Sequence, residues 1–170
     1  PKRSHRFLVD FTLPSGDNTQ IFARTFTKPQ YTLSTTEHNF LDKTFYYPGR
    51  VTWNEVTAQF VNSANPDMDN ELQNILEGSG YIFPQNMAVN SSLTELGRAT
   101  PNKFAAVNII GEKVRVTEIN GAGVSLGTYV LNNPFVSAVA YSTLDYSNDA
   151  LMTVDITFRY DWAEYIIGGS

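Results

Sequence analysis

One stretch near the end of the chain decides the fold class: Leu151–Tyr160, which reads LMTVDITFRY. Its apolar and polar residues alternate, and a period of two is typical of a half-buried β-strand. The apolar residues are Val154, Ile156, Phe158 and Tyr160, and the polar ones are Thr153, Asp155, Thr157 and Arg159. We expect the first set to face a core and the second to face water or a partner.

Similar alternation predicts further strands along the chain. Phe135–Tyr146 precedes this stretch, and the turn Ser147-Asn148-Asp149 makes the two the clearest pair. Other predicted strands are Phe7–Leu13, Thr19–Thr27, Tyr31–Thr36, Val51–Asn62, Phe104–Ile110, Lys113–Ile119 and Ser125–Asn132. Within Val51–Asn62 the alternation changes phase, and a bulge near Asn54-Glu55 would reconcile the two halves.

One helix is predicted, over Pro66–Glu77. Asn65 is a good N-cap residue, Pro66 suits the first helical position, and Gly78 supplies a stop. The apolar face consists of Met68, Leu72, Ile75 and Leu76. Residues 81–102 are expected to be mainly loop.

These elements predict a mainly β protein with one domain over residues 1–170. Two packed antiparallel sheets, forming a sandwich or barrel with one α-helix, would bury the alternating apolar faces. Such sheets have edge strands that must be covered or used, and pairing with identical copies would use them.

Composition favours an assembling subunit. Hydrophobic residues make up 42% of the 170 residues and charged residues 17%, below the usual share of roughly 25%. The net charge is −5, and among basic residues only Lys2, Arg3 and Arg6 cluster, so specific nucleic-acid binding is not expected. There is no cysteine, and neither a secretory signal nor membrane insertion is expected.

Catalytic and metal-binding patterns are weak throughout. The two histidines, His5 and His38, lack ligand partners at suitable spacing. The acids Asp67, Asp69 and Glu71 lack the glycine of a calcium loop and suit a helix start better. We therefore predict no catalytic residue, cofactor or metal site, although distant paired carboxylates are left open by sequence alone.

The aromatic segment Phe45–Arg50 (FYYPGR), which precedes the long strand, has two interpretations. Either it plugs the core, or it is an arm that docks on a neighbouring subunit, since aromatic residues dominate interface cores. The predicted contact residues of the arm 37–50 are Glu37, Asp42, Lys43, Phe45, Tyr46, Tyr47 and Arg50.

Two parts of the chain together resemble the tail tube proteins of contractile-tailed bacteriophages. The first is Tyr47–Asn62 (YPGRVTWNEVTAQFVN) followed by the helix Pro66–Glu77, and the second is Phe135–Tyr146 with Met152–Tyr165. These stretches cover roughly half of the chain.

The resemblance implies a β-barrel-like domain related to the tube proteins of type VI secretion. Six copies would close into a hexameric ring, and rings would stack through the arm into a hollow tube in the virion tail, assembled in the bacterial cytoplasm. Implied partners are the sheath protein, the tape-measure protein, the baseplate tube initiator and the tail terminator. DNA would pass into the host without specific binding, along a lumen for which Asp145 and Asp155 are candidates.

Other functions fit the same residues less well. The nearest alternative is a ring protein of a secretion or contractile injection system, or a baseplate tube initiator. A monomeric β-sandwich binding module is the alternative from another class, and an enzyme ranks third.

Overall fold

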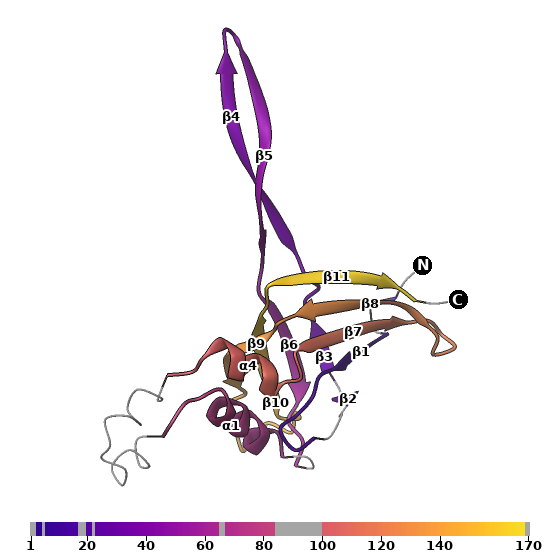
Figure 1. Cartoon of the computed structure of the whole chain (residues 1–170). Coiled ribbons are helices and arrows are strands. Elements are labelled where there is room, and N and C mark those ends of the chain that lie inside the picture. Colours follow the sequence, from indigo (N-terminus) through magenta and orange to yellow (C-terminus); the bar gives the residue numbers. More distant parts are fainter. Residues whose placement is uncertain are drawn as a thin grey trace.

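Two antiparallel sheets and a projecting hairpin make up the computed structural model of the chain (Figure 1). The structure describes residues 3–4, 6–16, 20–21, 23–64, 67–83 and 100–168. Sheet A has the strand order β11-β8-β7-β1-β2 and sheet B the order β3-β6-β10-β9, with the strand bounds given in the next two paragraphs. Among the described residues, β4 (Tyr31–Phe40) pairs only with β5 (Lys43–Trp53). The mainly β architecture with two packed sheets is confirmed.

Sheet B contains the stretch that decided the fold class. Its strands are β3 (Ala23–Phe26), β6 (Val56–Val61), β10 (Thr153–Arg159) and β9 (Phe135–Tyr141). In β10 the predicted apolar set is buried, and the alternate residues are partly or fully exposed. The predicted division of this strand between core and surface is therefore confirmed.

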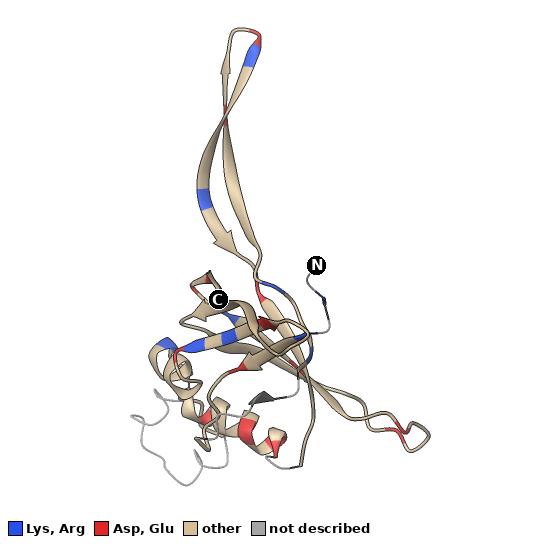
Figure 2. Cartoon of the chain, turned by 90° about the vertical axis from the view of Figure 1, so that its right-hand side faces the viewer, with Lys and Arg blue, Asp and Glu red and all other residues tan. Residues whose placement is uncertain are grey.

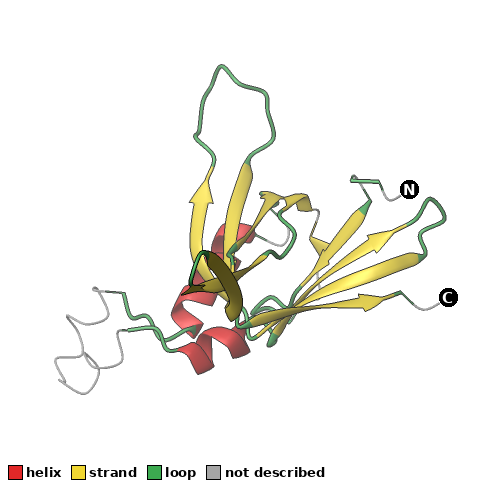
Figure 3. Cartoon of the chain, turned by 90° about the horizontal axis from the view of Figure 1, so that it is seen from above, coloured by secondary structure: helices red, strands yellow, loops and turns green. Residues whose placement is uncertain are grey.

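Sheet A lies on the side of the molecule away from the helices (Figure 3). Its strands are β1 (Phe7–Asp10), β2 (Gln20–Ile21), β7 (Lys113–Ile119), β8 (Ser125–Asn132) and β11 (Trp162–Ile167). The bounds of β7 and β8 are the predicted ones. No strand was predicted for β11, although its Trp, Tyr and Ile residues favour strands.

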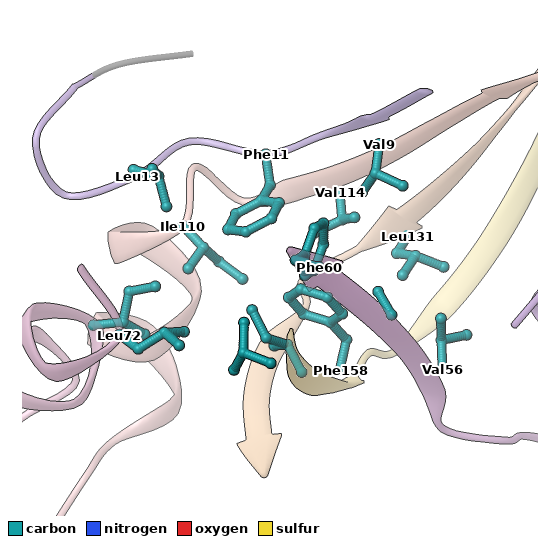
Figure 4. Packing of buried hydrophobic residues seen from close by; sticks show 14 of the residues in the cluster. Val9, Phe11, Leu13, Val56, Phe60, Leu72, Ile110, Val114, Leu131 and Phe158 are labelled. Atoms are coloured by element: carbon teal, nitrogen blue, oxygen red, sulfur yellow. The ribbon is translucent and has the colours of Figure 1, made fainter. Parts of the chain in front are cut away.

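The core lies between the two sheets and is centred on three aromatic rings (Figure 4). Phe11 packs edge-on against Phe60, at 5.9 Å between ring centroids, and against Phe158, at 5.6 Å. Phe60 comes from β6, Phe158 from β10, and Phe11 from the segment after β1. Edge-to-face geometry suits the quadrupoles of the rings, so these contacts join both sheets.

Helix α1 (Met68–Gly78) closes one end of the core with Met68, Leu72 and Ile75. The predicted start was wrong, because the N-cap is Asp67, whose side chain accepts hydrogen bonds from the amides of residues 69 and 70. The predicted N-cap Asn65 and the predicted first helical residue Pro66 lie outside the described residues. Gly78 is the last helical residue rather than the stop, and Leu76 is exposed.

The predicted strand Phe104–Ile110 is wrong, because this segment forms helix α4 (Lys103–Ile109). The Asn102 side chain caps it by accepting a hydrogen bond from the Ala105 amide at 2.9 Å. Phe104 is 80% exposed, whereas Val107 is buried. The described part of the chain therefore has two helices. Of the predicted loop 81–102, residues 84–99 lie outside the described residues.

Several predicted strands have different bounds. The segment 19–27 is divided between β2 in sheet A and β3 in sheet B, and Thr19 lies outside the described residues. The segment 51–62 breaks at Asn54-Glu55, so that β5 (Lys43–Trp53) ends before β6 begins. The predicted strand 135–146 ends at Tyr141. The first two of these breaks occur where the chain passes from one sheet to another.

Candidate functional site

The hairpin of β4 (Tyr31–Phe40) and β5 extends far from the body of the molecule (Figure 1). Every residue of β4 is exposed, as is every residue of β5 except Trp53. A two-stranded hairpin alone is marginally stable in water. The exposed apolar side chains on it are Tyr31, Leu33, Phe40, Leu41, Phe45, Tyr46, Tyr47 and Val51. Such a patch is typical of an interaction surface.

The tip of the hairpin is a strained two-residue turn. Phe40 pairs with Lys43, so the loop consists of Leu41 and Asp42. Leu41 has a φ of 57° and is 89% exposed. A non-glycine residue in this left-handed region costs about 1–2 kcal/mol. The chain therefore presents an exposed leucine at the outermost point of the structure despite a conformational cost.

The strand register places an aromatic stripe with one cation on one face of the outer hairpin. His38 lies opposite Phe45, Thr36 opposite Tyr47, and Phe40 opposite Lys43. Residues directly opposite each other share a face, and alternate residues along a strand return to it. Phe40, Phe45 and Tyr47 therefore lie together on one face, with Lys43 at the tip end.

The base of the hairpin is attached to the body by aromatic contacts. Trp53 lies 5.4 Å from the Tyr31 ring and 6.1 Å from the Tyr160 ring. Asn54 donates a backbone hydrogen bond to the Gln30 carbonyl at 2.9 Å. Tyr160 is buried and follows β10, so these contacts link the hairpin to sheet B.

A bulge lies between the base and the outer part of the hairpin. The register shifts between Leu33 and Thr35, and the Arg50 amide donates to Ser34 Oγ at 2.8 Å. A Cβ at Gly49 would overlap the Ser34 side chain. Glycine is therefore needed where the two strands approach at the bulge.

The hairpin contains all seven residues predicted for the arm. Glu37 lies opposite Tyr46, Asp42 is in the turn, and Lys43 begins β5. Phe45, Tyr47 and Arg50 follow along β5. Their predicted role in contacts between subunits stays a prediction. The arm predicted over residues 37–50 is part of a β-hairpin that begins at Tyr31, ten residues long in β4 and eleven in β5.

The two predicted lumen residues lie in different settings. Asp155 is in the middle of β10, opposite Gln59 and Ala140, on the face of sheet B away from the core. Asp145 is in the exposed loop after β9, where the amide and hydroxyl of Ser147 donate to its carboxylate and hold its pKa below the usual range. Whether either faces a lumen stays a prediction.

The outer face of sheet B is polar and carries small side chains. Thr57 and Thr157 lie on it with their hydroxyls 3.3 Å apart. Ala138 and Ala140 continue the same face on β9. At the end of this face, Arg159 Nε lies 3.5 Å from Glu55 Oε1. This face therefore offers hydroxyl groups and methyl groups to whatever lies against it.

Both edges of sheet B are open within the described residues. The strands at its edges are β3 and β9, and no described strand pairs with the outer side of either. Open edges present unpaired N–H and C=O groups that can pair with another chain. β9 has seven residues, without proline or lysine, so its edge lacks the residues that commonly block such pairing.

An apolar groove of about 720 Å³ lies between α1 and β9. Helix α1 contributes Leu72, Ile75 and Leu76 to it, and the core-facing side of β9 contributes Val136 and Val139. Asp69 and Tyr141 also line it. Partial burial of the phenol raises the pKa of Tyr141, and the charge of Asp69 adds to the rise.

Three solved structures similar to this chain come from the anti-feeding prophage and from the PVC extracellular contractile injection system. A chain of the anti-feeding prophage baseplate, 6-fold symmetrised, matches with a TM-score of 0.61 and 15% identity, covering 98% of this chain and 95% of that one. A chain of the PVC extracellular contractile injection system, in its extended sheath-tube complex, has the same TM-score and identity, with coverage of 98% and 92%. A chain of the anti-feeding prophage tube-terminating cap also gives 0.61 and 15%, with coverage of 99% and 92%.

The chain shares the fold of these three chains. At this identity the likeness concerns the fold, and it agrees with the resemblance drawn from the sequence. No protein-family profile matches the chain, and no curated protein sequence matches it.

Sequence reasoning expected free sheet edges but did not say which strands form them, and it missed the groove. The open edges of sheet B follow from non-local pairing, and the groove follows from the packing of α1 against β9. Their local signals were the strand pattern of Phe135–Tyr141 and the apolar face of the predicted helix, which includes Leu72, Ile75 and Leu76.

Two further observations concern other kinds of site. In the described ranges, no three residues among His, Cys, Asp and Glu gather as metal ligands would. Neither helix in the described part of the chain is long and apolar enough to cross a membrane.

Proposed function

We propose that this chain is the structural subunit of a hollow tube in a contractile tail-like machine. Residues 1–170 act as one tube domain, six copies close into a ring, and rings stack through the β4–β5 hairpin. The support is the shared fold, the open edges of sheet B and the exposed hairpin.

The observation that carries this proposal is the number of strands in sheet B. Its four strands are all antiparallel to their neighbours. Because the number of strands is even, the two edge strands, β3 and β9, run in opposite directions. When copies join head to tail, β9 of one copy therefore lies antiparallel to β3 of the next. Antiparallel pairing then continues across each joint and can close into a ring.

Sheet A is less suited to the same closure. It has five strands, each antiparallel to the next, so its two edge strands run in the same direction. Head-to-tail joining would then place parallel strands at each joint, and parallel pairing is slightly less stable per residue. Sheet B is therefore the sheet we assign to the ring.

The size of such a ring suits a conduit. Four strands from each of six copies give a barrel of about twenty-four strands, and barrels of roughly 16–18 strands already enclose an aqueous channel. The outer face of sheet B, which includes Asp155, would then line the lumen. With a net charge of −5, the subunit holds a phosphate backbone weakly.

In its finer form the proposal is a bacteriophage tail tube. It would assemble in the bacterial cytoplasm with a sheath protein, a tape-measure protein, a baseplate tube initiator and a tail terminator. DNA would then pass through the virion tail without specific binding. The subunit acts as a structural protein and not as an enzyme.

A second candidate function is the tube ring of a contractile injection system. The similar structures favour it, because they come from a baseplate, a cap and a sheath-tube complex of such systems. Both candidates use the same ring and stack, and they differ in what passes along the lumen.

Purification, size-exclusion chromatography and negative-stain microscopy test the shared proposal. We expect annular particles or tubes, whereas a monomeric binding module would elute near its mass of 19.0 kDa. Ala140→Lys places a charge on β9 beside the proposed joint and should abolish rings in a folded subunit, whereas Ala140→Ser should keep them. A wild-type protein that stays monomeric at every concentration and with every nucleating partner would contradict the proposal.

A further inference from the structure

We propose that the apolar groove between α1 and β9 receives the outer β4–β5 hairpin of a second copy of this chain. This inference rests on the proposed function, because it supplies the contact through which one ring holds the next. Three properties of the described residues support it: the placement of the two surfaces, their apolar character and their charge.

The two surfaces lie at opposite ends of the molecule. In two views that differ by 90°, the hairpin projects from one end of the body and α1 lies at the other end (Figures 1 and 2). A chain cannot fold this hairpin into its own groove across the body. A contact between unlike surfaces on opposite ends repeats from copy to copy and builds a stack rather than a closed dimer.

The apolar groups of the two surfaces complement each other. The groove is lined by aliphatic side chains of α1 and β9, including Leu72, Leu76 and Val139. Leu76 is 42% exposed, so part of this lining faces water in the free subunit. The hairpin offers Phe40 and Phe45, which are 62% and 46% exposed. Burying apolar area stabilises a contact by roughly 25 cal/mol per Å². Docking buries apolar area on the hairpin and in the groove at the same time, so it is favourable.

Charge fixes the orientation of the hairpin in the groove. Helix α1 carries acidic residues and no Lys or Arg, and Figure 2 shows this run of acids on α1. Among the residues lining the groove, Asp69 is the charged one. On the hairpin, Lys43 stands at the tip end of the aromatic stripe. With the stripe in the groove, Lys43 approaches Asp69, and such complementarity selects one register.

Cysteine cross-linking tests this contact directly, because the chain has no native cysteine. His38→Cys places a thiol on the aromatic face of the hairpin, and Gln73→Cys places one in the groove lining. The matched control is Asn70→Cys, which is exposed on α1 but does not line the groove. The two single variants are mixed, assembled and oxidised, since a disulfide needs Cα atoms about 4.4–6.8 Å apart.

We expect covalent dimers from the His38→Cys and Gln73→Cys mixture at least about tenfold above the mixture with Asn70→Cys, a difference of about 1.4 kcal/mol in preference. Tubes that form without this excess would overturn the docking inference and leave the proposed function standing. A second result would also overturn the docking inference: the thiol of the Gln73→Cys variant is protected from thiol reagents but forms no disulfide with a hairpin. In that case another partner fills the groove. Cross-links without any ring or tube would support the contact and contradict the proposed function.

A charge exchange provides the second test. Asp69→Lys and Lys43→Asp should each reduce the cross-linked yield several-fold at low salt, since each places like charges together. The double variant, with both changes in every copy, should recover most of the yield. Equal losses in the single and double variants, with all three folded, would show that these two residues do not meet.

Discussion

Deleting residues 40–47 removes the outer part of the hairpin and should separate assembly from folding. The register allows the cut ends to rejoin. Tyr31↔Trp53, Thr32↔Thr52, Leu33↔Val51 and Thr35↔Pro48 remain paired, and Thr36–Asn39 become the new loop. We expect a folded subunit that no longer stacks into tubes.

The deletion should lower the stability of the folded subunit only slightly. Every deleted residue is exposed, and none belongs to the core cluster. The loop grows from two residues to four, which costs about 0.6 kcal/mol in closure entropy. For a chain of this size, 1 kcal/mol shifts Tm by roughly 2–4 °C, so Tm should fall by less than about 4 °C. Assembly should be lost completely, because both the aromatic stripe and Lys43 are gone.

Thermal unfolding and negative-stain microscopy of the same preparation measure the two effects. The matched control is Thr44→Ser, which keeps the hydroxyl that donates to Asn39 Oδ1 at 2.7 Å and should assemble normally. Tubes of ordinary length from the deletion variant would refute the role of the hairpin. A collapse of Tm by tens of degrees would refute the claim that the hairpin is separate from the core.

Three further predictions concern stability. Phe158→Ala should lower the free energy of unfolding by about 3–5 kcal/mol in urea titrations, because the ring is fully buried, whereas Tyr146→Ala on the exposed loop should change it little. Leu41→Gly should raise hydrogen-exchange protection of the hairpin amides by relieving about 1 kcal/mol of strain, and unchanged protection would count against strain at the tip. The Lys103 ammonium, which donates to Asp161 at 2.6 Å, lowers the pKa of that carboxyl. Its stabilisation is therefore present above the ordinary pKa of about 3.9 and lost as pH falls through the lower folded pKa. Both side chains are exposed by more than a third, so Asp161→Asn should cost less than about 1 kcal/mol at neutral pH, and this cost should shrink as the pH falls through the folded pKa.

Sequence alone determined the parts of this protein that depend on local pattern. The alternation in β10 assigned each side chain to core or surface, because a strand turns successive residues to opposite faces. The bounds of β7 and β8 followed from the same pattern and from the turns between them. The aromatic segment with Phe45, Tyr46 and Tyr47 was recognised as unusual because its residue types alone favour interfaces.

Tertiary structure decided what depends on partners distant in the chain. Segment 104–110 was predicted to be a strand, but the structure forms a helix there, which the Asn102 side chain caps. The four-strand count of sheet B, its two open edges and the groove beside α1 exist only after distant strands have paired and packed. The physical reason is that a period of two specifies which face of a strand is apolar, whereas hydrogen bonding between strands specifies which edge remains free.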